Sequence, residues 1–238
     1  MPEAKHLKLY NSGSFFDQRA IAEQDYQRIA SLIEHFDTVI VESHPNLINE
    51  KCLRFRDLLI PELEVAVGLE TAHPEVLQKL NKQMTLEDFR KGVGYLARNE
   101  IRSRAFILLR PPFMSESEGV YWAKKSVDLA FEAGVDCCTI IPVRPGNGAM
   151  QRLMETGDFN MPGIRSLENV LEYGISLGKG RVFADVWDLK LFSACGSCLD
   201  ERTARLVNMN LQQKLLSHVS CTCNFHDVPS QPDQEHEN

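Results

Sequence analysis

Four of the seven cysteines in this 238-residue sequence fall into two closely spaced pairs near its C-terminal end. Cys195 and Cys198 form a CxxC pair, and Cys221 and Cys223 follow as a CxC pair. A CxxC turn can present two thiolates to one metal ion, and a second close pair completes a tetrahedral set. The spacing therefore predicts a structural zinc site at these four residues. A redox disulfide and an auxiliary iron–sulfur cluster are the alternatives.

Acidic residues stand at the ends of two apolar segments that have the length of β-strands. Glu42 ends one of these segments, and Glu70 and Thr71 follow the next. Two carboxylates at neighbouring strand ends are costly to bury unless they are paired or solvated. They could therefore bind a ligand's amine or the hydroxyls of a ribose. A structural salt bridge is the alternative.

The loops after other apolar segments also carry groups that can bind ligands. Ser12, Gly13 and Ser14 form a small polar loop, in which backbone N–H groups could approach a ligand closely or simply form a tight turn. Arg110 and Arg144 each follow a later segment. Their guanidinium groups could bind a carboxylate or a phosphate through two parallel hydrogen bonds.

Six apolar segments alternate with segments of helical periodicity, and they begin 26 to 46 residues apart. This spacing suits strand–helix units with parallel strands rather than hairpins. Their nearly continuous Val, Ile, Leu and Phe content is typical of strands covered on both faces. The sequence therefore predicts an α/β fold, either a doubly wound sheet or a parallel barrel. The predicted strands are Leu7–Tyr10, Thr38–Glu42, Glu64–Gly68, Arg104–Leu109, Val135–Ile141 and Arg181–Val186.

Two of the intervening helices have recognisable signals at their ends. Thr85 and Asp88 have the spacing of a capping box. Ser115 or Ser117 could cap the next helix, and Gly134 would end that helix in a left-handed turn.

The charge and composition exclude some classes of function. The formal net charge of −7 argues against non-specific binding of nucleic acid, including DNA. Four of the acidic residues lie in the segment 226–238, whose Gln, Pro, Asp and Glu content predicts disorder. No apolar run approaches the ~20 residues that span a bilayer, so no membrane association is expected. Seven cysteines without an export signal indicate a reducing compartment, and we expect a cytoplasmic protein.

Several strand-end segments, in their shared order and spacing, resemble the radical S-adenosylmethionine (SAM) superfamily. The resemblance is to the branch of the archaeosine-synthase radical enzyme in particular, and more distantly to the catalytic subunit of Elongator. It implies a partial parallel (β/α)6 barrel of TIM-like type that holds SAM at its open top. The first barrel strand is expected to be missing, and a small Cys-rich extension follows the barrel. The matching stretches are Leu9–Asp17, Val41–Pro45, Val65–Ala72, Leu77–Lys82, Leu108–Phe113, Ile141–Met150 and the two cysteine pairs.

The resemblance also implies roles for residues at the strand ends. Ser12–Ser14 match the loop that lies near the methionine amine of the cofactor. Glu70–Thr71 match the region where the family contacts the ribose, and Glu42 lies between these two sites. His44 stands where relatives have arginine, so a cofactor contact made by that arginine is not expected in this chain.

The cysteine triad that defines the family, CxxxCxxC, is not found in this sequence. In the family this triad holds the reducing [4Fe–4S] cluster, so we expect no radical chemistry from this chain alone. One hypothesis is a fragment of an enzyme that generates a 5′-deoxyadenosyl radical from SAM to modify tRNA or a related substrate. The alternative is a catalytically inactive, zinc-stabilised binding protein that retains the barrel.

These expectations divide the chain into three parts and suggest its partners. Residues 1–190 form the radical SAM-like barrel, 191–225 the Cys-rich metal-binding extension, and 226–238 a disordered acidic tail. By analogy with the family, the partner is tRNA or another protein.

Overall fold

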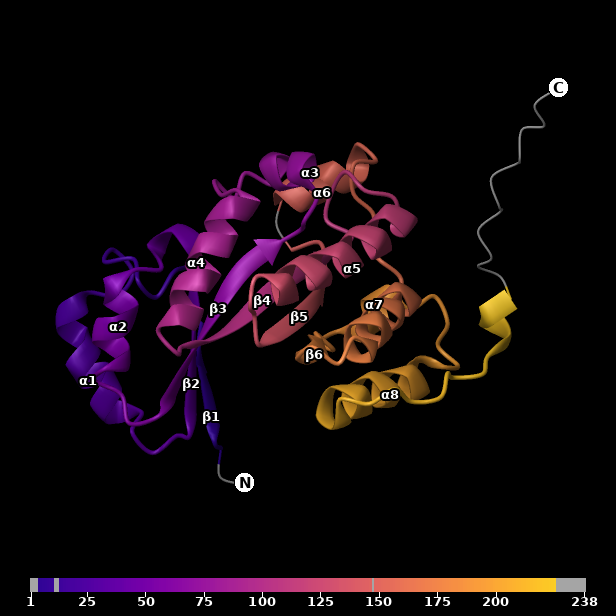
Figure 1. Cartoon of the computed structure of the whole chain (residues 1–238). Coiled ribbons are helices and arrows are strands. Elements are labelled where there is room, and N and C mark those ends of the chain that lie inside the picture. The colour runs from indigo at the N-terminus through magenta and orange to yellow at the C-terminus, as the bar shows by residue number, and fades with distance from the viewer. Residues whose placement is uncertain (1–3, 11–12, 147, 226–238) are drawn as a thin grey trace.

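The computed structural model describes residues 4–10, 13–146 and 148–225, and its centre is a six-stranded parallel sheet (Figure 1). The strands are ordered in space as they are along the chain. A doubly wound sheet reverses its strand order at a switch point, so this sequential order identifies the expected partial barrel instead. In the described part of the chain, the first and last strands each have one strand neighbour. The strands are β1 (His6–Leu9), β2 (Thr38–Ser43), β3 (Glu62–Glu70), β4 (Arg102–Leu109), β5 (Cys137–Pro142) and β6 (Arg181–Ala184).

Helices follow the strands and cover the outer face of the curved sheet (Figure 1). Both expected caps are confirmed: Thr85 forms a capping box with Asp88, and Ser115 forms one with Glu118. Each such cap stabilises its helix by roughly 1 kcal/mol. No helix among the described residues has the length and hydropathy needed to cross a bilayer. The helices are α1 (Tyr26–Leu32), α2 (Glu50–Arg56), α3 (Pro74–Lys79), α4 (Leu86–Arg98), α5 (Glu116–Glu132), α6 (Gly148–Glu155), α7 (Ile164–Ser176) and α8 (Leu199–Gln212), with short 3-10 helices at Glu23–Asp25, Pro45–Leu47, Leu189–Phe192 and Thr222–Phe225.

The two faces of the sheet differ in chemistry because alternate residues of a strand point to opposite sides. The face toward the helices is apolar and fully buried, as at Val65, Val67 and Ile107. The inner face carries charged residues such as Glu64 and Arg104, which line a cavity. The expectation of strands covered by apolar layers on both faces is therefore wrong for the inner face. The concave side of an open half-barrel encloses a polar space instead.

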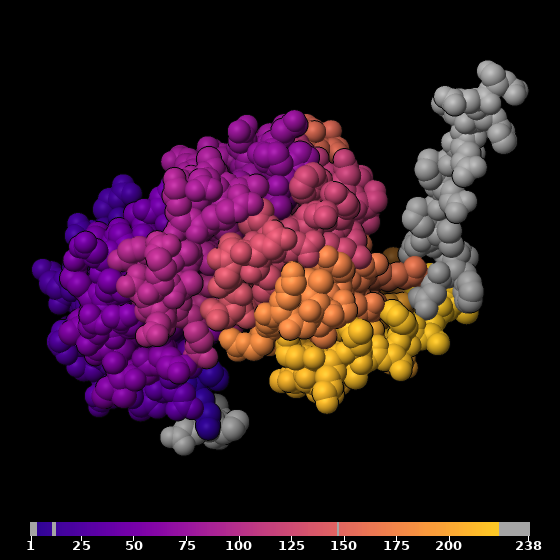
Figure 2. Space-filling view, in the orientation of Figure 1, coloured from indigo at the N-terminus to yellow at the C-terminus, as the bar shows by residue number. Residues whose placement is uncertain are grey.

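The last helix, α8, packs against the barrel. Its Leu206 and Met209 are fully buried and belong to the same hydrophobic core as the sheet. Figure 2 shows a recess between the indigo N-terminal strand and the yellow α8. The division of the chain at residue 190 stays a prediction, and the predicted tail 226–238 lies outside the described residues.

Candidate functional site

A cavity of about 1110 Å³ lies on the inner face of the half-barrel, and all six strands and α8 contribute to its wall. Ligands of parallel α/β barrels bind at the carboxyl ends of the strands. At that end of this cavity the wall includes Glu42, Glu70 and Lys82, together with Trp187 after β6. We take this mouth of the cavity as the candidate functional site.

The two predicted acids come together at this mouth. Glu70 has a φ of 65°, and the register of β3 against β4 shifts between Gly68 and Glu70. Glu70 Oε1 lies 2.9 Å from Lys82 Nζ. Burial, and to a smaller extent the Glu70 carboxylate, raises the pKa of Glu42. A second carboxylate beside one ammonium group leaves this mouth negatively charged, which favours a cationic ligand.

The polar loop after β1 is fixed against the end of β2. The hydroxyl of Ser14 accepts a hydrogen bond from the backbone N–H of His44 at 2.8 Å. The backbone N–H of Phe15 donates to the carbonyl oxygen of Glu42 at 2.7 Å. Gly13 lies in the same loop, which places it next to the strand that carries Glu42. Ser12, the third residue predicted in this loop, lies outside the described residues.

Thr71 is buried and does not belong to the cavity wall. Its hydroxyl accepts a hydrogen bond from the backbone N–H of His73 at 3.2 Å. The backbone N–H of Ala72 donates to the Ser126 hydroxyl at 2.8 Å. These bonds shape the turn after β3, so Thr71 positions the strand end that presents Glu70.

His44 holds the loop that carries Lys82. Its Nδ1 accepts a hydrogen bond from the backbone N–H of Asn46 at 3.2 Å. A ring nitrogen that accepts leaves the proton on the other nitrogen, so Nε2 donates to the carbonyl oxygen of Lys82 at 2.8 Å. His44 thus fixes the backbone of the residue whose ammonium group pairs with Glu70.

The two arginines singled out from the sequence lie in ion pairs within the chain. Arg110 Nη1 lies 2.5 Å from Glu116 Oε2 and donates to the carbonyl oxygen of Met161 at 2.7 Å. Arg144 Nη1 lies 3.0 Å from Asp185 Oδ2. Neither guanidinium group belongs to the wall of the inner cavity.

Sequence reasoning missed a buried charged cluster deeper in the cavity. Arg104 Nε lies 2.7 Å from Glu64 Oε1, and Arg181 Nη2 lies 3.3 Å from Glu64 Oε2. Arg104 also donates to the Thr139 hydroxyl at 3.1 Å. Burial raises the pKa of the nearby Tyr10 to about 12, so its phenol stays protonated at neutral pH. Charged residues alternate along two of the strands, as Glu62-x-Glu64 and Arg102-x-Arg104, and this alternation could have predicted a polar inner face.

The four predicted metal ligands converge between β6 and the end of the described chain. Their Sγ atoms all lie within 4.8 Å of one another. Cys195 Sγ lies 3.7 Å from Cys221 Sγ, and Cys198 Sγ lies 3.7 Å from Cys223 Sγ. A hydrogen bond from the backbone N–H of Cys198 is the main factor that lowers the pKa of Cys195 to about 6. Thiolate is the form that binds metals, so this group could hold a metal ion.

A buried charged network ties this cysteine group to the barrel. Arg202 Nε donates to Cys198 Sγ at 3.2 Å, and its Nη1 pairs with Glu168 of α7. Glu168 also pairs with Arg205 Nη1 at 3.2 Å. A donor to a ligating sulfur and a buried carboxylate behind it are typical outer partners of a metal site. Arg165 of α7 donates a hydrogen bond to the carbonyl oxygen of Cys223.

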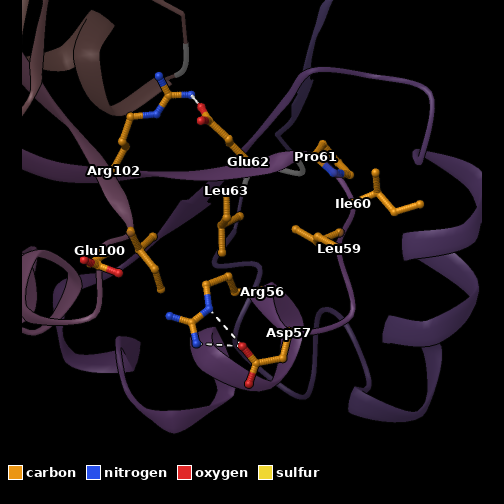
Figure 3. Close-up of a pocket in the computed structure, with 10 residues that line it drawn as sticks. Arg56, Asp57, Leu59, Ile60, Pro61, Glu62, Leu63, Glu100 and Arg102 are labelled. Atoms are coloured by element: carbon orange, nitrogen blue, oxygen red, sulfur yellow. Dashed lines mark hydrogen bonds and ion pairs between the residues drawn. The ribbon is translucent and has the colours of Figure 1, made fainter.

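A second pocket, of about 410 Å³, lies at the opposite ends of the strands (Figure 3). Figure 3 shows Arg56 beside Asp57 and Arg102 beside Glu62 on its wall. Arg56 and Asp57 stand at the end of α2, and Glu62 and Arg102 begin β3 and β4, away from the carboxyl ends at which barrels bind ligands. We do not assign this pocket to the candidate site.

A solved structure shares this fold. An archaeal Elp3 from Methanocaldococcus infernus, solved with an N-terminal deletion, superposes with a TM-score of 0.65 at 15% sequence identity. The superposition covers 88% of this chain and 55% of that chain. The sequential parallel half-barrel and this likeness together identify the partial TIM-like fold of radical SAM proteins.

The sequence is also similar to curated archaeal proteins that share one name. The chain is 29% identical over 172 residues to archaeosine synthase subunit beta of Thermococcus kodakarensis, and 25% identical over 174 residues to the Methanosarcina acetivorans protein of the same name. Each alignment covers 69% of this chain, and the chain spans about half the length of these curated relatives (53% and 49%). No protein-family model matches the chain. The resemblance to the radical SAM superfamily, in its archaeosine-synthase branch, is confirmed.

Proposed function

We propose that this chain is the SAM-binding barrel of a radical SAM enzyme that modifies tRNA or a related RNA together with a partner subunit. The observation that carries the proposal is the convergence of Glu42 and Glu70 at the cavity mouth of a barrel of this type. The relatives are named as a subunit of archaeosine synthase, which supports the protein partner. The RNA substrate is what the resemblance to this branch implies. The many free thiols favour the reducing cytoplasm as its compartment.

The residues at the mouth fit SAM. This cofactor carries a positive ammonium group, a positive sulfonium group, a negative carboxylate and two ribose hydroxyls, so its net charge is positive. Glu42 and Glu70 offer carboxylate oxygens, while Lys82 balances one of the two charges. The positive charge of a bound cation would favour the ionised form of Glu42 and so oppose the burial and repulsion that raise its pKa.

The described residues do not fit the [4Fe–4S] cluster of the family. All seven cysteines are described, and none has the CxxxCxxC spacing. The four that converge do not line the inner cavity. We therefore derive no step through such a cluster. Its ligands would come from polypeptide outside this sequence, and one-electron cleavage of SAM would require them.

The four-cysteine group is proposed as a structural zinc site. Four sulfurs at about 2.3 Å from one tetrahedral ion lie about 3.8 Å apart. Two of the Sγ separations are 3.7 Å, and all four Sγ atoms lie within 4.8 Å of one another. Thiolates that bind different irons of a cluster lie farther apart than thiolates on one ion. A disulfide needs about 2.05 Å between its sulfurs. Zinc therefore fits the present geometry better than the iron–sulfur and disulfide alternatives.

A second candidate function is a catalytically inactive, zinc-stabilised binding protein. It is favoured by the contrast between a complete four-cysteine group and a cavity mouth without cysteine ligands. Both candidates predict a bound zinc ion. They differ in whether 5′-deoxyadenosine forms when a reductant and a polypeptide that carries the cluster ligands are supplied.

The proposed site is tested by equilibrium dialysis of the chain against labelled SAM. Wild type should bind saturably, and Glu70→Gln should weaken binding by about tenfold or more, because a charge-assisted hydrogen bond is lost. Glu75→Gln changes an exposed acid on α3 and serves as the matched control. Absence of saturable binding, or equal binding by Glu70→Gln, would overturn the proposal. Metal analysis of the same samples should give about one zinc per chain and no iron.

A further inference from the structure

Trp187 leaves 77% of its surface exposed, although it lies on the wall of the inner cavity. It follows β6, at the carboxyl end of the sheet, where Glu42 and Glu70 also line the mouth. No role in the barrel's core accounts for an indole in this position. Its flat, apolar surface is available to whatever occupies the mouth.

The backbone of Trp187 is fixed by two neighbouring side chains. Asp185 Oδ1 accepts a hydrogen bond from the Trp187 backbone N–H at 3.0 Å. Arg144 Nη2 donates to the Trp187 carbonyl oxygen at 2.8 Å, and Arg144 Nη1 pairs with Asp185 Oδ2 at 3.0 Å. The segment that carries the exposed ring is therefore held in place from both sides.

Arg144 also lies against the indole ring itself. Its guanidinium carbon lies 5.9 Å from the ring centre of Trp187 and 5.4 Å from that of Phe192. A cation near an aromatic face is attracted to the ring's electrons. With Arg144 between Trp187 and the buried Phe192, the ring has a supported side, and most of its surface remains open.

We propose that Trp187 is a stacking platform for a nucleobase at the cavity mouth, either the adenine of SAM or a base of the RNA substrate. This inference rests on the proposed function and names the ring-binding part of the same site. A planar heterocycle gains contact with the flat indole face, and the carboxylates of the mouth can accept hydrogen bonds from the attached ribose.

The charges around Trp187 favour this ligand over an apolar protein surface. Asp185, Glu70 and Lys82 line the same mouth, so an apolar partner would bury charged groups without compensation. A nucleoside presents a planar ring together with hydroxyl groups. It therefore matches both the exposed indole and the polar side chains beside it.

The chain offers a direct optical test because it contains two tryptophans. Trp122→Phe leaves Trp187 as the only indole, and Trp122 lies on α5 outside the cavity wall. This variant would be titrated with SAM, adenosine, a short single-stranded RNA, and ribose as the probe without a base. Adenosine should quench the Trp187 emission, and so should at least one of SAM and the RNA. Ribose should not quench it.

Substitutions at the platform give a second readout. Trp187→Ala should weaken binding of the quenching ligand by about 5- to 150-fold, the range expected for loss of one stacked base. Trp187→Phe should retain most of the affinity. Ile60→Ala serves as the control, because Ile60 is also 77% exposed but lies in the pocket at the opposite strand ends.

The outcomes separate this inference from the proposed function. If Trp187→Ala changes neither SAM binding nor RNA binding, the platform is overturned and the proposed SAM site stays intact. Quenching by RNA without any SAM binding would support the platform and overturn the SAM site. Unchanged Trp187 emission with every base-containing probe would overturn the platform.

Discussion

The two edges of the sheet are built differently. At β6, the Gln213 side-chain amide pairs with the backbone N–H and carbonyl of Val182 at 2.8 and 2.9 Å. The Asn210 amide pairs in the same way with Ala184 at 2.9 and 2.8 Å. At β1, the described residues provide no strand on the outer side. Unpaired backbone groups at a strand edge are a template for another strand.

A helix can therefore take the place of a strand when its amides lie in register with the edge. A carboxamide offers one acceptor and two donor hydrogens, so it can satisfy both backbone groups of one residue. Asn210 lies in the last turn of α8, and Gln213 follows the helix in a left-handed conformation with a φ of 51°. Their amides lie next to alternate residues of β6, Ala184 and Val182. The β6 edge is closed to further pairing, so an additional strand can join this sheet only at β1.

The largest expected effect comes from the buried charges that hold α8 against α7. Glu168 is 5% exposed and pairs with Arg202 and Arg205. Glu168→Ala would remove the carboxylate that these two buried guanidinium groups share, although Arg202 keeps Cys198 Sγ and Arg205 keeps Glu172 as partners. The free energy of unfolding should therefore fall by about 3–5 kcal/mol, the range for removal of one partner of a buried ion pair. Amide hydrogen exchange should accelerate in β6 and stay unchanged in β1.

Denaturant unfolding and exchange measured by mass spectrometry check this expectation. Glu201→Ala removes an exposed acid from the first turn of α8 and should change stability by no more than about 0.5 kcal/mol. Equal effects of the two substitutions would show that the charged network does not secure α8.

Removal of the proposed metal should have the next largest effect. A ligand that binds only the folded chain stabilises it by about 3–4 kcal/mol at 100 to 1,000 times its dissociation constant. Thermal unfolding with and without a chelator should show this loss, together with faster exchange in β6. Cys198→Ser should show the same loss without the chelator and no further change with it. Unaltered stability after confirmed loss of metal would contradict a structural role.

Each side-chain amide at the β6 edge should contribute less to the free energy of unfolding than the proposed metal does. Asn210→Ala and Gln213→Ala should lower the free energy of unfolding by about 1–3 kcal/mol each, because buried backbone groups lose their partners. Asn210→Asp keeps an acceptor for the Ala184 N–H but places a carboxylate against its carbonyl oxygen. It should therefore be no more stable than Asn210→Ala. The matched control is Asn208→Ala, an exposed change on the same helix, and a similar loss there would refute the account of the edge.

The smallest expected effect on stability comes from Glu42, which lies on β2 beside the open edge. The raised pKa of Glu42 means that the folded chain holds this proton more tightly than the unfolded chain. Its stabilising contribution is complete below the ordinary pKa of glutamate and is lost as pH rises through the raised value. Glu42→Gln should therefore lose less stability than wild type between about pH 4 and pH 7. Parallel pH profiles of the two proteins, measured by chemical denaturation, would rule this out.

Much of the barrel could be predicted from local patterns, whereas its inner face could not. The six apolar segments became β1 to β6, and Thr85 and Ser115 cap the helices expected. The pairing of Glu64 with Arg104 depends on the register between β3 and β4, which no local pattern specifies. Pairing across the β6 edge likewise depends on where α8 ends relative to that strand.

The candidate site shows the same limit. The CxxC and CxC pairs predicted a convergence of four thiols, because each pair is already close along the chain. Glu42 and Glu70 could be predicted to meet because parallel strands end at one edge of the sheet. Arg144 was expected to hold a ligand, but it pairs with Asp185, which lies 41 residues away in sequence. Trp187 carried no sequence signal, since its exposure depends on the path of the chain after β6.

A crystal structure of the chain grown with SAM tests the central claim most directly. The account predicts SAM at the mouth of the inner cavity, with its ammonium group or ribose hydroxyls within hydrogen-bond distance of Glu42 and Glu70. SAM bound away from both carboxylates, as in the pocket of Figure 3, would contradict it. So would an empty mouth at SAM concentrations that saturate binding in solution.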